Sequence, residues 1–375
     1  MNNSFGLYIH IPFCRAKCPY CDFYSVTYSE EAADRYTEAV LRAIKSSPKQ
    51  DMPVDSIYFG GGTPVLMGAK RLLAMVNAAK DSFSVTDDCE ITLEANPAAM
   101  TLEDLCLLRQ GGFNRISIGV QSAVDEQLKT LGRLHSSAQA VDSVKLCRIA
   151  GFDNISVDLM LATPEQTEDS IRQFCDTFCP LVEHISAYLL KVEEGTPFGK
   201  QHMERFCPDE ERAADLYLFA VNELASRGFA QYEISNFAKN GLYSRHNTRY
   251  WDCSQYLGIG PAAHSFWQGE RRFFERDLES FLSAENPWEL WQSDGNGGDF
   301  FEYAMLRLRL SNGLIFADCE KRYPSINLIP LKQQAVSLQK HDLITMDDDH
   351  IALTVNGFLV SNSVIWKLLE SYDEE

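Results

Sequence analysis

The feature that most constrains the fold of this chain is an alternation of short apolar segments with longer amphipathic ones. Six segments have the length and composition of strands: LYIHIP (7–12), DSIYFGG (55–61), EITLEAN (90–96), RISIGVQ (115–121), NISVDLML (154–161) and HISAYLL (184–190). Helical patterns lie between them, as in SEEAADRYTEAVLRAIK, where Ser29 is placed to cap a helix that starts with acidic residues. Six such repeats predict an α/β fold with a parallel sheet and helices on its outer face, either an open doubly wound sheet or a full or partial barrel.

Polar residues and glycines stand at the ends of these predicted strands. The sequence Gly-Gly-Gly-Thr-Pro follows the second strand, Glu94 and Asn96 close the third, Gln121 closes the fourth, and Asp158 lies inside the fifth. Ligands of parallel sheets and barrels bind at the carboxyl ends of the strands. We therefore expect these residues to meet at one mouth.

The alternation of predicted strands and helices ends in the second half of the chain. An acidic helix is predicted in PDEERAADLYLFAVNELASRG (208–228), and an aromatic, glycine-bearing region follows to about residue 268. The stretch WQSDGNGGDF (291–300) has the composition of a flexible connection. Beyond it we expect helices and a short strand, ITMDDDHIALT (344–354), with a turn at its acidic centre. A small appended domain is the resulting prediction.

The acidic composition argues against two classes of partner. Lys and Arg number 34 against 53 Asp and Glu, which gives a net charge of −19, and such a chain repels phosphate backbones and anionic lipid surfaces. We expect no nucleic-acid partner. The sequence does not open with a secretion signal and contains no apolar run near the roughly 20 residues of a membrane span. We therefore expect no stable membrane insertion and a cytoplasmic location.

Three cysteines, Cys14, Cys18 and Cys21, follow the first strand in a C-x3-C-x2-C arrangement. Structural zinc sites close with four ligands, and no further Cys or His lies nearby because His10 belongs to the strand. Three thiolates better suit a [4Fe-4S] cube that is held at three corners and open at the fourth. The chain has eleven cysteines, an odd number that does not favour a disulfide framework. Outside the cluster only Cys175 and Cys179 have metal-site spacing; small packed thiols are expected at Cys89, Cys106, Cys147, Cys207, Cys253 and Cys319.

The cysteine spacing resembles the signature of the radical S-adenosylmethionine (SAM) enzymes. In that family the amine and carboxylate of SAM chelate the fourth iron, and an electron from the cluster splits the sulfonium to give a 5′-deoxyadenosyl radical. The resemblance implies a [4Fe-4S] cluster, SAM, and an electron donor such as flavodoxin or ferredoxin. It also implies a set of SAM contacts: Tyr8, Tyr20, Gly61, Gly62, Thr63, Glu94, Gln121, Arg133 and Asp158. Within this set the glycine turn would receive the amino group, and the polar side chains would hold the ribose and the carboxylate.

Four motifs, YIHIPFC, FGGGTP, IGVQS and VDLM, resemble one branch of that family, the oxygen-independent coproporphyrinogen III oxidases and their relatives. EYAMLRLRLSNGL (302–314) resembles the small, mainly helical, winged-helix-like C-terminal domain of the same branch. The resemblance implies a partial (β/α)6 TIM-like barrel over residues 1–275, with the cluster, SAM and haem-motif regions. It implies a helical domain of the HemN type over residues 285–375.

The branch contains a decarboxylase and haem chaperones of the HemW type, and two departures from the decarboxylase pattern favour the chaperones. Phe23 stands where the oxidases carry a further cysteine, and only thirteen residues precede the cluster. HNTRYW (246–251) matches the HNxxYW motif of the chaperones. His246 would then ligate haem iron, Tyr250 and Trp251 would offer flat faces to the porphyrin, and Arg245 and Arg249 would pair with its propionates. His264 and Cys253 are the competing iron ligands.

The resulting prediction is a haem chaperone that binds a [4Fe-4S] cluster, SAM and haem and transfers haem to an apo-haemoprotein acceptor. The alternative is an enzyme acting on a related tetrapyrrole, either an oxygen-independent coproporphyrinogen III oxidase or a radical SAM enzyme that opens haem anaerobically. No catalytic residue is assigned by the sequence. The two classes differ in outcome, because a chaperone leaves haem unchanged whereas an enzyme consumes SAM and releases a modified tetrapyrrole.

Overall fold

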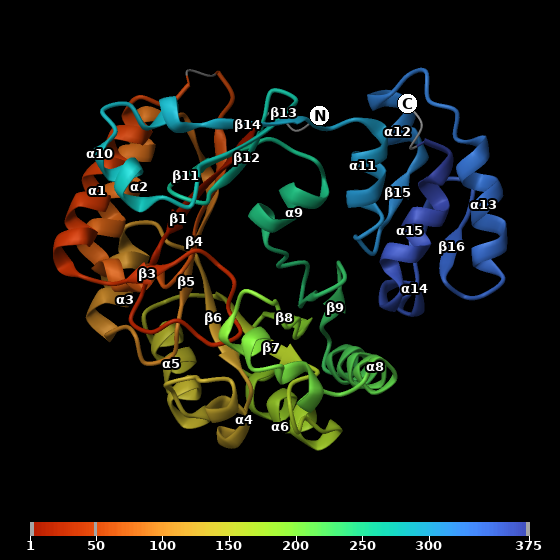
Figure 1. Ribbon diagram of the computed structural model, residues 1–375, viewed down its shortest axis with the longest axis horizontal. Coiled ribbons are helices and arrows are strands. Elements are labelled where there is room, and N and C mark those ends of the chain that lie inside the picture. The colour runs from red at the N-terminus through yellow and green to blue at the C-terminus, as the bar shows by residue number, and fades with distance from the viewer. Residues whose placement is uncertain (1–3, 49–50, 373–375) are drawn as a thin grey trace.

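The computed structural model describes residues 4–48 and 51–372, and its largest feature is a twelve-stranded sheet (Figure 1). All six predicted strands are present as neighbouring parallel strands in chain order: β1 (Phe5–Ile11), β4 (Val54–Gly61), β5 (Val85–Ala95), β6 (Arg115–Gln121), β7 (Asn154–Leu161) and β8 (His184–Leu189). A doubly wound sheet reverses its strand order at a switch point, and these six strands do not. The α/β barrel-type fold predicted from the sequence is thus confirmed.

Helices cover the outer face of the parallel strands (Figure 1). They are α1 (Glu30–Lys45), α2 (Gly68–Ser82), α3 (Leu102–Gln110), α4 (Asp125–Thr130), α5 (Ser137–Ile149), α6 (Glu168–Phe178) and α8 (Glu210–Ser226). The predicted N-cap of α1 is confirmed, since Ser29 Oγ accepts a hydrogen bond from Ala32 N at 3.2 Å. The predicted acidic helix is α8.

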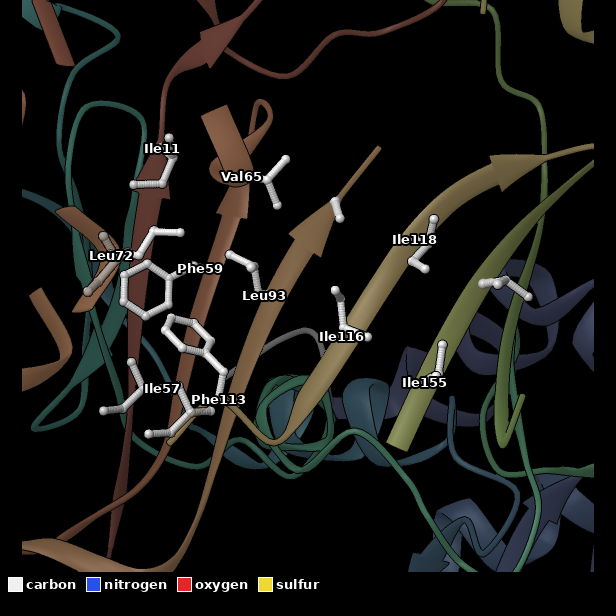
Figure 2. Close-up of a cluster of buried hydrophobic side chains, with 14 of the residues drawn as sticks. Ile11, Ile57, Phe59, Val65, Leu72, Leu93, Phe113, Ile116, Ile118 and Ile155 are labelled. Carbon is white, nitrogen blue, oxygen red and sulfur yellow. The ribbon is translucent and has the colours of Figure 1, made fainter. Parts of the chain in front are cut away.

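Side chains of the parallel strands alternate between an apolar face and a polar one. Ile57, Phe59 and Leu93 belong to the hydrophobic core, into which Leu72 of α2 also packs (Figure 2). The residues next to them in sequence, such as Tyr58 and Glu94, line a cavity on the other face. Because successive side chains of a strand point to opposite faces, the same strands build both the core and the site.

Additional strands extend the sheet beyond the six predicted ones. On one side β11 (Tyr256–Ile259) pairs in parallel with β1, followed by antiparallel β12 (His264–Trp267), β13 (Glu270–Phe273) and β14 (Gln292–Asn296). On the other side lie β10 (Asn236–Ala238) and β9 (Ala230–Gln231). The flexible connection predicted at 291–300 is wrong: half of it is the exposed edge strand β14, which places residues 292–296 in the first unit rather than in the second.

Short elements complete this first unit. They are β2 (Phe13–Cys14), β3 (Val26–Thr27), η1 (Pro64–Met67), α7 (Pro197–Lys200), η2 (Met203–Phe206), α9 (Arg245–Trp251), α10 (Leu278–Ser283) and η3 (Pro287–Leu290). Helix α9 carries the HNTRYW motif and lies between the sheet and the C-terminal unit (Figure 1). Within the described residues, no helix is both long and apolar enough to span a bilayer.

The C-terminal unit has its own hydrophobic core and a three-stranded sheet. Its elements are α11 (Phe300–Arg307), β15 (Leu314–Ile315), α12 (Phe316–Arg322), α13 (Ile329–Gln339), β16 (Ile344–Met346), β17 (His350–Leu353), α14 (Val355–Leu359), α15 (Ser361–Leu369) and η4 (Glu370–Tyr372). The predicted strand and turn at 344–354 form the hairpin β16–β17. The unit docks beside α9, where Arg307 forms an ion pair with Asp252 and Arg322 Nη2 donates to Cys253 O at 3.1 Å.

Candidate functional site

The three clustered cysteines lie on a half-buried loop that starts at β2. Cys14 Sγ lies 3.5 Å from Thr63 Oγ1, and Cys18 Sγ accepts a hydrogen bond from Arg133 Nη1 at 3.3 Å. The loop is therefore held against the second and fourth β-α connections. Among the residues searched, no group of three or more His, Cys, Asp or Glu is arranged to hold a single metal ion. Three separated thiols on one loop fit a cluster whose irons occupy different corners better than they fit one zinc ion.

The glycine turn after β4 packs directly against the base of the cysteine loop. Gly62 N donates to Ile11 O at 2.8 Å, and Thr63 N donates to Phe13 O at 2.7 Å. A Cβ at Gly62 would lie 2.6 Å from Phe13 O, and a Cβ at Gly61, whose φ is +108°, would lie 2.5 Å from the His10 ring. The chain's own packing thus requires both glycines. The two glycines can still contact SAM as predicted, but the packing alone already explains why glycine stands at both positions.

Glu94 and Asp158 are the carboxyl groups that the parallel strands contribute to the lining of the cavity. Glu94 accepts hydrogen bonds from Tyr58 Oη at 2.7 Å and from Gly61 N at 3.1 Å. Burial raises the pKa of Glu94 although both hydrogen bonds oppose the shift. Burial, and next the charge of Glu94, raise the pKa of Asp158 to about 7. Asp158 therefore changes its charge near neutral pH, whereas an ordinary aspartate does not.

Gln121 and Arg133 lie at the carboxyl end of β6. Gln121 has a φ of +74°, a conformation that is uncommon for non-glycine residues, and its Oε1 accepts from Tyr188 Oη at 2.9 Å. Arg133 Nη2 donates to Asn96 Oδ1 at 2.6 Å and to Gly119 O at 2.5 Å. These contacts aim the Arg133 guanidinium at the cysteine loop, where Nη1 also lies 3.4 Å from Tyr20 Oη.

Six of the nine predicted SAM residues border two hollows, and Gly61, Gly62 and Gln121 line neither of them. A cavity of about 1100 Å³ is lined by Tyr8, Tyr20, Cys21, Glu94 and Asp158, among others. A smaller hollow of about 220 Å³ is lined by Cys18, Thr63 and Arg133. The larger volume slightly exceeds the range of about 300–1,000 Å³ that is usual for a site holding one small ligand. Inward-facing residues that sequence reasoning missed also line it: Tyr58, Arg115, Ser117, Ser186 and Tyr188. The period of two along the predicted strands is the signal that would have found them.

His246 on α9 is fully buried, and both of its ring nitrogens have partners. Nδ1 lies 3.0 Å from Ser56 Oγ, and Nε2 lies 3.0 Å from Tyr250 Oη. Burial, with the charge of Arg249 next, lowers the pKa of His246 to about 3, so the imidazole is neutral at physiological pH. Tyr250 lines the large cavity and His246 does not. The Tyr250 side chain thus separates the cavity from the His246 imidazole, which is the ring predicted to ligate iron.

Three other predictions for the motif region need correction or comment. Arg249 does not face a ligand, because it is 3% exposed, pairs with Asp55, and donates to Ser4 O at 3.1 Å. Arg245 bonds Asp88 at 2.9 Å. Both lie against a different hollow and neither lines the large cavity, so this arrangement does not support the predicted pairing with haem propionates. Trp251 is half-buried and is not among the residues that line the large cavity.

The two competing iron ligands differ in access. His264 is exposed, lines the large cavity and stacks on Phe273 with a centroid separation of 5.7 Å. Cys253 is 2% exposed, and burial raises its pKa to about 11, so its thiol stays protonated. Cys253 packs in the core of the C-terminal unit and is not among the residues that line the cavity. Of the competing ligands, only His264 is open to the cavity.

Comparison with known proteins gives consistent matches. Residues 8–178 match the radical SAM superfamily. The chain is 32% identical to the heme chaperone HemW of Mycobacterium tuberculosis, over 97% of this chain and 95% of that protein. It is 36% identical to the heme chaperone HemW of Escherichia coli, over 77% and 81% of the two chains. The solved structure of the Escherichia coli coproporphyrinogen III oxidase HemN, a radical SAM enzyme, is similar with a TM-score of 0.84 and 20% identity, over 97% and 90% of the chains. At that identity the structural similarity shows the fold.

Proposed function

Because this chain belongs to the radical SAM superfamily and to the family of its relatives named heme chaperone HemW, we propose that it binds haem beside its [4Fe-4S] cluster and SAM and passes the haem to an acceptor protein. One observation carries the proposal. The same cavity of about 1100 Å³ is bordered both by predicted SAM residues and by Tyr250 and His264. A second ligand therefore has room next to SAM.

The cluster and SAM are assigned to the mouth of the barrel. Cys14, Cys18 and Cys21 would hold three irons, and the cluster supplies an electron to the SAM sulfonium when both are bound. Arg133 donates to the Cys18 sulfur, and such hydrogen bonds tune the potential of a cluster. Glu94 offers its carboxylate to donors of SAM, already oriented by Tyr58 and Gly61.

His246 is the imidazole that we assign to haem iron. Histidine ligands usually use one ring nitrogen for the metal and bond a neighbouring group through the other, and Ser56 Oγ provides that partner at Nδ1. The remaining nitrogen points at Tyr250, which borders the cavity. Displacing the Tyr250 hydroxyl costs about 1 kcal/mol, the net value of one hydrogen bond. His264 is the alternative ligand, because its ring is open to the cavity. Unlike His246, it has no hydrogen-bond partner among the described residues that would orient the ring.

Two partners follow from the same proposal. Arg15 and Lys17 are exposed on the cysteine loop of this otherwise acidic chain. An acidic electron donor such as flavodoxin or ferredoxin would be attracted to that loop. An apo-haemoprotein would be the acceptor, and the cytoplasm would be the location.

The experiment that tests the function is anaerobic. The cluster is reconstituted, SAM and a strong reductant are added with either haem or coproporphyrinogen III, and tetrapyrroles and 5′-deoxyadenosine are followed by mass-resolved chromatography. We expect haem to stay chemically intact, to bind one to one, and to move to an added apo-haemoprotein. Protoporphyrinogen and carbon dioxide, or an opened haem formed in step with 5′-deoxyadenosine, would instead make the chain an enzyme.

A further inference from the structure

The floor of the large cavity contains a buried cation without a direct partner. Arg115 is the first residue of β6, is 1% exposed, and lines the cavity. Within residues 4–48 and 51–372, its Nε and Nη1 atoms make no hydrogen bond. Thr92 of β5 stands next to Arg115 in the register of the two strands, and its fully buried Oγ1 also has no partner. Two neighbouring donors are thus left open in the interior of the barrel.

Such an arrangement is unusual in a folded protein. Buried polar groups are nearly always hydrogen-bonded, and a buried charge is normally paired. Glu94 and Asp158 accept their hydrogen bonds from other groups and interact with Arg115 only through its charge, which lowers the pKa of both against the larger effect of burial. Burial and the charge of Glu94 also raise the pKa of Asp158 to about 7, so Asp158 carries only part of a negative charge at neutral pH. Arg115 and Thr92 are therefore complementary to an anionic ligand.

We propose that Arg115, which lines the cavity and has Thr92 beside it in the next strand, forms a carboxylate subsite that binds a propionate group of the tetrapyrrole. The proposal rests on the haem-binding function above and takes over the role that the sequence assigned to Arg245 and Arg249. A guanidinium recognises a carboxylate through two parallel hydrogen bonds, and a neighbouring hydroxyl adds a third. A haem carries iron and carboxylates on one ring system and would engage His246 and Arg115 together. The charge of Arg115 also acts on His246, where it is the third cause of the lowered pKa, behind burial and the charge of Arg249.

The carboxylate of SAM is a different candidate for this subsite, and the position of Arg115 argues against it. Gln121 and Arg133, assigned to SAM, lie at the carboxyl end of β6, whereas Arg115 starts that strand. At about 3.3 Å per residue, Arg115 and Gln121 are roughly 20 Å apart along the strand. The charge of Arg115 nevertheless acts on Glu94 and Asp158, which are also assigned to SAM, so the test below includes SAM binding as a readout.

The test compares haemin with its dimethyl ester, in which both carboxylates are blocked. Each is titrated into the reconstituted protein in the same mild detergent, and the ratio of the two dissociation constants is measured. We expect wild-type protein to prefer the free acid by about tenfold, and Arg115→Met to bind both forms alike. The matched control is Arg276→Met, an exposed arginine of the same cavity, which should keep the wild-type ratio.

The outcomes separate the subsite from the function. If wild-type protein binds neither compound, the haem-binding function itself is wrong. If it binds both equally, or if Arg115→Met keeps the tenfold preference, haem binding stands and the subsite is wrong. Loss of SAM binding in Arg115→Met with an unchanged haemin ratio would assign the residue to SAM and overturn the proposal. Should Arg115→Met not fold, Thr92→Val decides, because it should lower the preference about threefold and an unchanged preference contradicts the subsite.

Discussion

The barrel mouth and helix α9 are both rich in unusual residues, yet their polar groups are used in opposite ways. At the mouth, the cysteine thiols are half-buried, and Asp158 lines open space. On α9, both nitrogens of His246 are occupied, and Arg249 is enclosed by Asp55, Ser4 and Ser56. A short motif can therefore owe its composition to the fold as well as to a ligand. Unsatisfied groups in a cavity, rather than motif residues as such, are the better indication of a binding site.

The largest expected effect is the loss of the cluster, which concerns the barrel mouth and not helix α9. Changing Cys14, Cys18 or Cys21 to serine should abolish the [4Fe-4S] cluster, because a hydroxyl does not replace a thiolate ligand. The visible absorption and iron content after anaerobic reconstitution measure this loss. Cys106→Ser, a half-buried thiol on α3, is the matched control and should keep a full cluster. A cluster that survives in all three single variants would contradict the assignment.

Arg249→Ala tests the structural role of α9. Removal of this guanidinium leaves Asp55 without its buried partner, and breaking such a pair costs about 3–5 kcal/mol. Urea unfolding of the variant should show a loss of this size in the free energy of unfolding. Arg245→Ala breaks an exposed pair on the same helix and should cost less than about 1 kcal/mol. Equal costs for the two variants would show that α9 is not held by Arg249.

Asp158 makes the stability of the ligand-free mouth depend on pH. Its folded pKa of about 7 lies above the ordinary value of 3.8, so the folded state holds the proton more tightly and its contribution to stability is lost as pH rises from about 4 to 7. The slope is at most about 1.4 kcal/mol per pH unit. Asp158→Asn does not titrate, so the difference in unfolding free energy between the wild type and this variant should change with pH in that window. A constant difference would contradict the shifted pKa.

The smallest expected effect is a change in haem affinity at Tyr250, the residue through which helix α9 borders the cavity. Tyr250→Phe removes the hydroxyl that occupies His246 Nε2. If His246 takes the iron, haem no longer competes with this hydrogen bond, and its dissociation constant should fall about fivefold. Tyr256→Phe, also at the cavity, is the control. An unchanged affinity in Tyr250→Phe together with a loss of haem in His264→Ala would assign the iron to His264.

Much of the fold was predictable from the sequence, because its signals are local. The six parallel strands, the Ser29 cap, the acidic helix α8 and the β16–β17 hairpin follow from periodicity, capping and turn residues over a few positions. The edge strand β14 was missed because its sequence is polar and glycine-bearing, and only its pairing with β13 makes it a strand. β-structure depends on such neighbours more than helices do.

The sequence by itself determined the superfamily, the positions of the six parallel strands and the three cysteines that suit a cluster, since spacing along the chain is enough to define them; the order of the strands came from the structure. The tertiary structure decided which residues face the cavity. It placed Ser56 against His246 across 190 positions of sequence and Asp55 against Arg249 across 194. It also left Arg115, which lines the cavity, and its neighbour Thr92 with side-chain atoms that have no hydrogen-bond partner within residues 4–48 and 51–372. Whether a side chain is satisfied or free depends on contacts between distant segments, and these form only when the chain packs.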